Sequence, residues 1–115
     1  MSANALTDTR RVSVLRDLAI LDTPAEAAYD DIAMLAAASC RSAMAAVNFV
    51  DHDRHWTKAI AGVAGRQGSN VDANLSLCAA TICTDGGLLS VPDMLADERW
   101  QSHPFVMGGP QLRFY

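Results

Sequence analysis

Residues 44–61 read MAAVNFV, DHDR and HWTKAIA in succession, and this stretch decides the fold. The first part is a short apolar run bounded by turn formers, which is typical of a strand buried on both faces. Aspartates at 51 and 53 favour a turn over 51–54, because their side chains bond nearby backbone amides. The run 55–61 then predicts a returning strand. The sequence therefore predicts an antiparallel hairpin.

Two helices are predicted before this hairpin. Apolar residues within 12–21 recur at spacings of three and four, which indicates a leading helix with an apolar stripe. For the second helix, Thr23 is a candidate cap, Pro24 suits the first helical position, and Glu26 can reach back to the cap's amide. We therefore expect a helix that starts within a residue or two of Pro24 and ends near Cys40.

After the hairpin, turn-forming residues divide the chain into shorter pieces. We expect a polar loop over 62–74, a short helix over 75–83 capped by Ser76, and a stop at the glycines that follow. The remaining predictions are a strand at 88–91, a helical turn from Pro92 to residue 99 or 100, an irregular segment over 103–110, and the start of a strand at 112–115.

Length and composition exclude several classes of protein. The chain has 115 residues, half of them apolar, which suits a single domain over residues 1–115. A net charge of −4 excludes the basic surface that nucleic acids or anionic membranes require. No apolar run approaches a membrane span, and the amino terminus lacks a secretion signal. We therefore expect a cytoplasmic protein whose cysteines, Cys40, Cys78 and Cys83, are free thiols.

Several strings together resemble a bacterial GAF domain. They are RDLAILDTPAEAAYDDIA at 16–33, AVNFVDHDRHWTKAIAG at 46–62, SLCAATI at 76–82, LLSVPDMLADERWQSHPFV at 88–106 and LRFY at 112–115. The resemblance implies a PAS-related α+β fold, with a central antiparallel sheet, helices packed on one face and a ligand cavity on the other. Domains of this variety are often found at the amino terminus of sensor histidine kinases and diguanylate cyclases.

The function that the resemblance implies is regulatory. It is a sensory domain that binds a small molecule, pairs with a second copy, or does both, and controls a kinase or cyclase output domain. The alternative is a structural dimerisation module without a ligand, whose leading helix presents its stripe to the partner. In either case we expect no enzymatic activity and no cofactor.

Four residues match positions near the implied cavity. Asn48 could orient a ligand, or be a buried amide satisfied by backbone. Trp56 could lie at the cavity rim or pack in the core. Cys78 falls in the short helix over the cavity, either as a ligand or redox contact or as a small buried residue. Asp93 lies in a loop at the cavity mouth, or simply caps the next helical turn.

Covalent and metal chemistry find less support in the sequence. Many relatives carry a histidine two residues after the cysteine that Cys78 matches, but this chain has Ala80 there. A cysteine followed at once by a histidine would indicate an attached bilin, and this chain contains no such pair. Some GAF proteins reduce free methionine sulfoxide, and that enzyme remains a minor alternative. We expect no metal site, because His52 and His55 fall in a predicted exposed turn. Lys58 could meet an anion, but a solvated strand residue is the commoner case.

The resemblance also implies an incomplete sheet. In relatives, the strand that begins near residues 112–115 continues, and a further strand inserts beside 46–50. We therefore expect a sheet that lacks its carboxy-terminal strands and a first strand with one unpaired edge. Residues 1–22 form the leading helical segment of this single domain. Edge pairing with a second copy would be one remedy, and a homodimer is the expected assembly.

Overall fold

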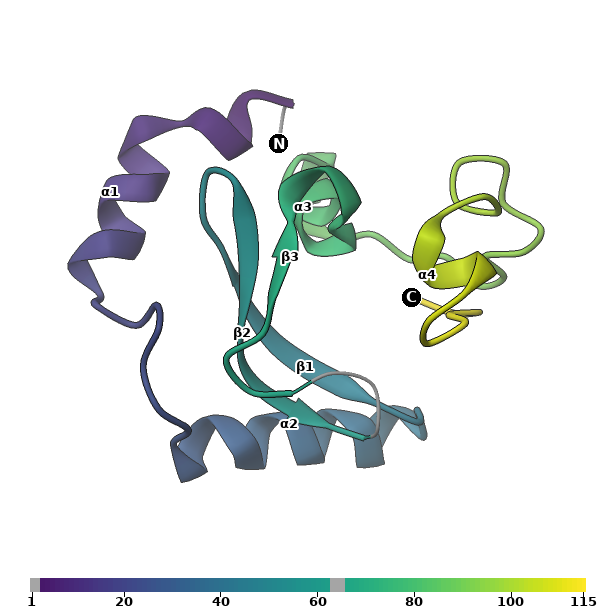
Figure 1. Ribbon diagram of the computed structural model, residues 1–115, viewed down its shortest axis with the longest axis horizontal. Coiled ribbons are helices and arrows are strands. Elements are labelled where there is room, and N and C mark those ends of the chain that lie inside the picture. Colours follow the sequence, from purple (N-terminus) through teal and green to yellow (C-terminus); the bar gives the residue numbers. More distant parts are fainter. Residues whose placement is uncertain (1–2, 63–65) are drawn as a thin grey trace.

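The computed structural model describes residues 3–62 and 66–115, and its centre is a three-stranded antiparallel sheet in the order β1-β2-β3 (Figure 1). The strands are β1 (Ala45–Val50), β2 (Arg54–Ala61) and β3 (Asn70–Asp72). Residue 50 pairs with residue 55, and residue 45 with residue 61. The predicted antiparallel hairpin is therefore confirmed.

The third strand was not predicted from the sequence. β3 lies within the segment expected to be a polar loop, whose residues 63–65 fall outside the described residues. Its three residues pair with 54–56 of β2. So short a strand has no periodicity of its own to detect, and its formation depends on the free edge that β2 offers.

The first strand is half-buried, so the expectation of a strand buried on both faces is wrong. Val50 is the only residue of β1 that is buried. Among the described strands β1 pairs only with β2, so it forms one edge of the sheet. Its register also shifts between Val47 and Asn48, where Lys58 of β2 is an extra, unmatched residue. The extra residue makes β2 the bulged strand, and a bulge of this kind bends the strand that carries it.

The long helix α2 (Ala27–Cys40) packs against β1 and β2. It ends where predicted, at Cys40, and Arg41 closes it in the left-handed conformation at a φ of 51°. It begins three residues after Pro24, and the predicted capping box is absent because Glu26 makes no side-chain cap. Thr23 and Glu26 instead bind Lys58, a buried ammonium that needs acceptors.

The leading helix begins and ends earlier than predicted. A 3-10 helix, η1 (Ala3–Thr7), precedes α1 (Thr9–Asp17). Asp8 caps α1 by accepting hydrogen bonds from the amides of Arg10 and Arg11. Apolar spacing reveals a helix only from its first apolar residue, so the polar first turn was missed. In α1 itself only Leu15 is buried.

Short helices follow the sheet. They are η2 (Ala73–Leu75), α3 (Leu77–Ile82) and η3 (Asp85–Gly87). Ser76 caps α3 as predicted, because its hydroxyl accepts a hydrogen bond from the amide of Ala79 at 3.0 Å. In Figure 1, α2 runs below the strands and α3 lies above them, beside β3.

The carboxy-terminal segment gathers around a small core of its own. Leu77, Val91, Met94 and Val106 form this core. The predicted strands at 88–91 and 112–115 are not formed, although Val91 and Tyr115 exchange two backbone hydrogen bonds of 2.6 and 3.0 Å. The predicted helical turn after Pro92 is not formed either. A short helix, α4 (Pro104–Met107), occupies the stretch that was expected to be irregular. Pro104 suits the first helical position there, and His103 caps it.

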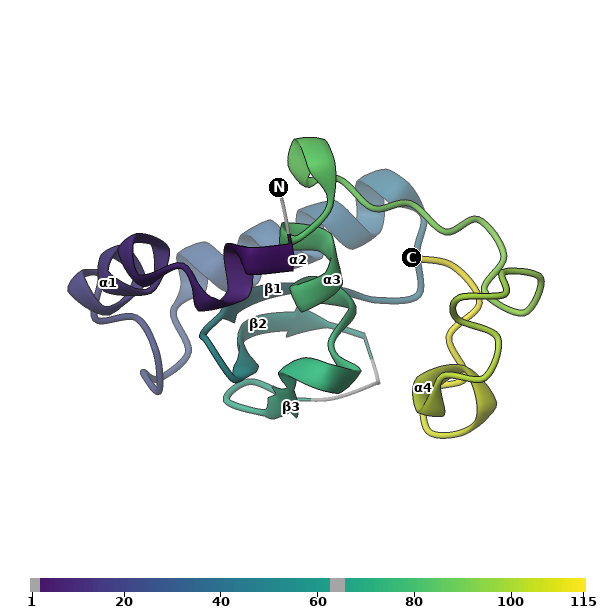
Figure 2. The same cartoon turned by 90° about the horizontal axis from the view of Figure 1, so that it is seen from above.

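The overall architecture is α+β, compatible with a GAF-like fold. Figures 1 and 2 show α1 and α4 at opposite ends of a molecule that measures 39 × 32 × 24 Å. None of the helices in the described ranges combines the length and the apolar character needed to cross a membrane. The helices are not confined to one face of the sheet, since α3 also contacts β1 and β2.

Candidate functional site

The two faces of the hairpin have different roles. Asn48 bonds to Cys78 of α3, whereas the ring of the next residue, Phe49, meets the ring of Tyr29 in α2 with centroids 6.3 Å apart. Neighbouring strand residues point to opposite faces. One face therefore packs on α2, and the other turns its polar side chains toward α3.

A cluster of polar side chains lies on the α3 face. Asn48 donates through Nδ2 to Cys78 Sγ at 3.2 Å and accepts through Oδ1 from Thr57 Oγ1 at 2.7 Å. The Tyr115 hydroxyl lies 3.7 Å from the same sulfur and 2.9 Å from Thr81 Oγ1. We call Asn48, Thr57, Cys78, Thr81 and Tyr115 the Asn48 cluster. It joins both hairpin strands, α3 and the last residue of the chain.

Burial sets the ionisation of Tyr115. Desolvation is the main reason that the pKa of its hydroxyl is raised above the usual range, and Cys78 adds to the effect. A tyrosine is already a neutral phenol at physiological pH, and this shift makes its ionisation still less favourable, so Tyr115 can donate a hydrogen bond. The Asn48 cluster contains no lysine, arginine, aspartate or glutamate. Its side chains exchange hydrogen bonds with one another between the sheet and α3.

His55 lies beside this cluster and is buried, so the expectation that it sits in an exposed turn is wrong. It belongs to β2, and its Nδ1 lies 2.5 Å from the hydroxyl of Ser76. Burial lowers the pKa of His55 below its usual value, which keeps the ring neutral near neutral pH. The Ser76 hydroxyl thus links the sheet to the first turn of α3.

The structure brings together two of the four predicted site residues. Asn48 and Cys78 are in direct contact. Trp56 lies in β2 opposite Phe49, on the α2 face, and is only 1% exposed. Asp93 is exposed in the carboxy-terminal segment, where its carboxylate accepts a hydrogen bond from the amide of Leu95 at 3.1 Å. All three cysteines are free, as expected.

Sequence inspection missed the partners that complete the Asn48 cluster. Thr57 could have been found from the hairpin register, but only if the bulge had been known. Tyr115 gave no signal, because it reaches Cys78 across 37 positions of sequence. A contact between residues so far apart in the sequence depends on the tertiary fold.

Lys58 is the clearest correction on the opposite face. It was expected to be solvated, but its side chain is fully buried. The ammonium lies 2.5 Å from a carboxylate oxygen of Glu26 and donates to Thr23 Oγ1 and the carbonyl of Pro24 at 2.8 and 2.6 Å. It also lies 5.3 Å from the centre of the Tyr29 ring. These acceptors compensate the buried charge and hold the segment before α2.

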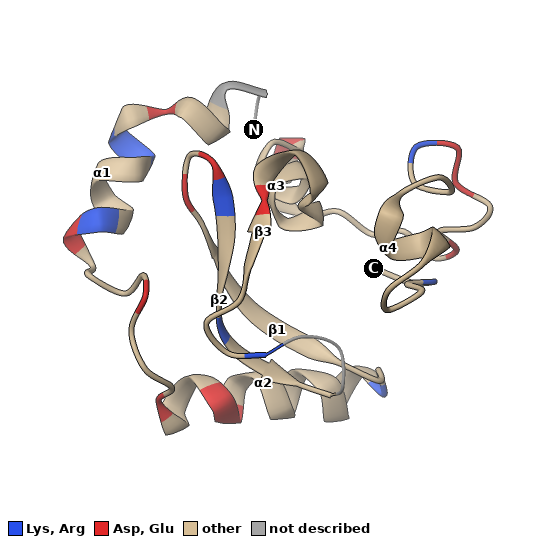
Figure 3. Ribbon diagram, viewed as in Figure 1, with Lys and Arg blue, Asp and Glu red and all other residues tan. Residues whose placement is uncertain are grey.

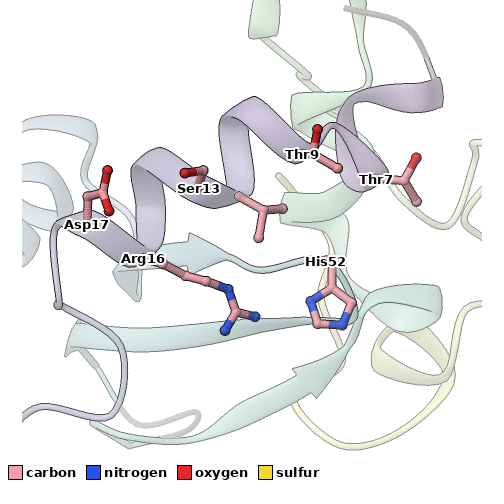
Figure 4. A pocket seen from close by; sticks show the side chains of 7 residues that line it. Thr7, Thr9, Ser13, Arg16, Asp17 and His52 are labelled. Carbon is pink, nitrogen blue, oxygen red and sulfur yellow. The ribbon is translucent and has the colours of Figure 1, made fainter.

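A hollow of about 490 Å³ lies between α1 and the hairpin turn (Figure 4). Figure 4 shows Arg16 and His52 reaching toward each other across it. Both contact Asp51, at 3.4 and 3.2 Å. Burial alone would raise the pKa of Asp51, but hydrogen bonds from His52 and the charge of Arg16 lower it. The other lining residues are Thr7, Thr9, Val12, Ser13 and Asp17.

This hollow is electrostatically mixed. Two aspartates, Asp17 and Asp51, offset the one arginine, so the hollow has no excess positive charge for an anion. The neighbouring side chains Asp51, His52 and Asp53 bring their ligand atoms within 4.8 Å of one another. His52 and Asp53 are exposed, and such groups are common without an ion. We therefore place the candidate site at the Asn48 cluster.

Comparison with known proteins finds one informative similarity. No family model matches this chain. A cyclic di-GMP phosphodiesterase of Pseudomonas aeruginosa is 30% identical over 105 residues, which cover 91% of this chain. The chain spans only 17% of that relative's length. The resemblance to GAF domains is thus supported at a coarser level, as similarity to part of a bacterial signalling protein.

The same similarity contradicts one expectation from the sequence. We expected a protein that is not an enzyme, but the relative carries an enzyme's name. The expectation rested on the resemblance to regulatory domains and on the local surroundings of Cys78 and Cys83, which bear on cysteine chemistry alone. They carry no information about the hydrolysis of a phosphodiester.

Proposed function

We propose that this chain forms the ligand-responsive, GAF-like regulatory part of an enzyme of bacterial cyclic di-GMP turnover. The observation that carries the proposal is the extent of the similarity: it covers 91% of this chain but 17% of the phosphodiesterase. A region of that size suits one domain within a larger protein. The similarity favours a phosphodiesterase over the kinase or cyclase output that the GAF resemblance implied.

The Asn48 cluster is the proposed point of ligand action. A ligand shifts a conformational equilibrium only through a difference in its affinity for the two states. Here a small polar molecule that replaces the bonds of Asn48 would alter the contact between β1 and α3, because Asn48 Nδ2 is bonded to Cys78. Any resulting movement of α3 would reach the carboxy-terminal core through Leu77, the first residue of the helix.

A chimeric enzyme tests this proposal. The segment of the Pseudomonas phosphodiesterase that aligns with this chain would be replaced by residues 1–115, and hydrolysis of cyclic di-GMP measured. We expect the chimera to be active. We expect Asn48→Leu to change its rate about fivefold or more, the lower end of typical coupling between sites. The matched control is Ser102→Ala, at an exposed position of the carboxy-terminal segment.

Three outcomes would contradict the proposal. The first is an inactive chimera, although circular dichroism shows that the inserted chain is folded. The second is an active chimera in which Asn48→Leu and Ser102→Ala have the same rate. The third is hydrolysis of cyclic di-GMP by the purified 115-residue chain alone, which would place the catalytic site within this segment.

A further inference from the structure

The outward face of α2 is apolar along most of the helix. Its solvent-facing stripe has spacings of four, three and four and consists of Ala28, Ile32, Leu35 and Ser39, all exposed. Ile32 is 54% and Leu35 is 67% exposed. The opposite face, with Tyr29 and Ala33, packs on the sheet. A surface helix normally carries charged residues on its outer face, and a helix that is apolar all round is normally covered on both sides.

The charges of α2 are confined to its ends. Asp30 and Asp31 lie near the amino end, Arg41 follows the last helical residue, and residues 32–40 contain no charged side chain. Figure 3 shows this distribution as red at one end of α2, blue beyond the other end and tan between them. The helix therefore presents an apolar centre between ends of opposite sign.

We propose that two copies of this chain pair through α2 in antiparallel orientation about a two-fold axis. The axis passes between residues 33 and 34, and this register places Ile32 against Leu35 of the second copy. The same register sets Ala28 against Ser39 of the second copy, so large side chains meet at the centre and small ones at the ends. A two-fold interface requires such self-complementarity. The proposal stands independently of any role in cyclic di-GMP turnover.

Charge fixes the direction of the pair. In the antiparallel arrangement, Arg41 of each copy lies near the acidic amino end of the other, and the two helix dipoles oppose each other. In a parallel two-fold pair, Asp31 would face Asp31 and Arg41 would face Arg41. Like charges placed opposite one another cost affinity. The spacing of the stripe is also that of helices that pack side by side with interlocking side chains.

The first test measures the mass of the purified chain by sedimentation velocity over a concentration series. We expect a dimer whose dissociation constant rises at least about tenfold with Leu35→Lys, because the two-fold axis makes the change act twice. The matched control is Leu18→Lys. Leu18 follows the last residue of α1 and is 61% exposed, so the same substitution is made at a similarly exposed leucine outside α2. A monomeric parent, or a dimer disrupted by Leu18→Lys alone, would overturn the proposal.

The second test reads the orientation by cross-linking. Two single variants, Ala28→Cys and Ser39→Cys, would each be made in a Cys40→Ser background and oxidised with copper phenanthroline. The antiparallel register brings position 28 of one copy beside position 39 of the other, within disulfide reach. It separates the two copies of position 28 by roughly 16 Å along the helix axis.

We therefore expect a covalent dimer when the two variants are mixed before oxidation, and none when either is oxidised alone. Cross-linking of each variant with itself would show a parallel pair. Absence of a cross-link in the mixture would rule out the proposed register. Both of these results can be recognised whether or not the chain regulates a phosphodiesterase.

Discussion

At the scale of single residues, His55 couples the stability of the hairpin to pH. Its ring is buried and contacts Ser76, and its pKa is lowered by burial. In the unfolded chain the ring titrates near 6.5, the ordinary value for histidine. Below that pH the unfolded chain binds a proton that the folded chain does not bind. Acidification therefore favours unfolding.

We expect the free energy of unfolding to fall as pH drops below about 6.5, by at most about 1.4 kcal/mol per pH unit for this one group. Urea denaturation between pH 7.5 and 5.5 would measure the slope. His55→Gln should remove most of it. His52→Gln, at the exposed histidine of the hairpin turn, should leave it in place. A stability that stays constant or rises on acidification in the parent chain would contradict this account.

At the scale of elements, Gly62 determines how the chain leaves β2. Its φ is +106°, and a Cβ atom there would lie 2.5 Å from the carbonyl oxygen of Ala43 and 2.6 Å from Met44 Cβ. The start of β1 and the end of β2 thus approach each other so closely that no side chain fits. Gly68 also has a positive φ, of +85°, but a Cβ there would have no heavy atom within 4 Å.

The two glycines form a matched pair of substitutions. Gly68→Ala should lower the free energy of unfolding by about 1 kcal/mol, the cost of placing alanine in a left-handed conformation. Gly62→Ala should cost about 3 kcal/mol or more, because the backbone must also move away from Ala43 and Met44. Urea denaturation of both variants would measure the difference. Equal losses would show that the close approach is not rigid.

At the scale of the whole molecule, one arginine ties the amino-terminal segment to the sheet. Arg11 of α1 donates through Nε to the carbonyl of Ala5 at 2.7 Å and through Nη2 to that of Leu6 at 3.0 Å. Its Nη1 donates to the carbonyl of Val50, at the end of β1. Each carbonyl is bonded by a different nitrogen of the planar guanidinium, a spread of donors that a compact ammonium lacks.

We expect Arg11→Lys to release the amino-terminal segment while the sheet stays folded. Amide hydrogen exchange over residues 5–17 should become about tenfold faster or more, as expected when a few hydrogen bonds that close a local opening are lost. Exchange over β2 should not change. Arg10→Lys, at the exposed neighbouring position, is the control. Faster exchange throughout the chain would show that Arg11 supports global stability instead.

The order of the main elements could be predicted from local sequence. The hairpin follows from an apolar run, an aspartate-rich turn and a second run, and α2 and α3 follow from apolar spacing, Cys40 as an end and Ser76 as a cap. These signals act over a few residues, through backbone hydrogen bonds and side-chain periodicity. They hold where no distant part of the chain competes for the same side chains.

The partners of the buried polar groups could not be predicted in the same way. Lys58 takes Thr23 and Glu26 away from their expected capping roles, and Tyr115 reaches Cys78 from the end of the chain. A buried charge or hydroxyl must find a partner wherever the folded chain brings one, and that partner can lie anywhere in the sequence. The resemblance to GAF domains indicated Asn48 and Cys78 as candidates, whereas the contact between them arises from the packing of α3 against the sheet.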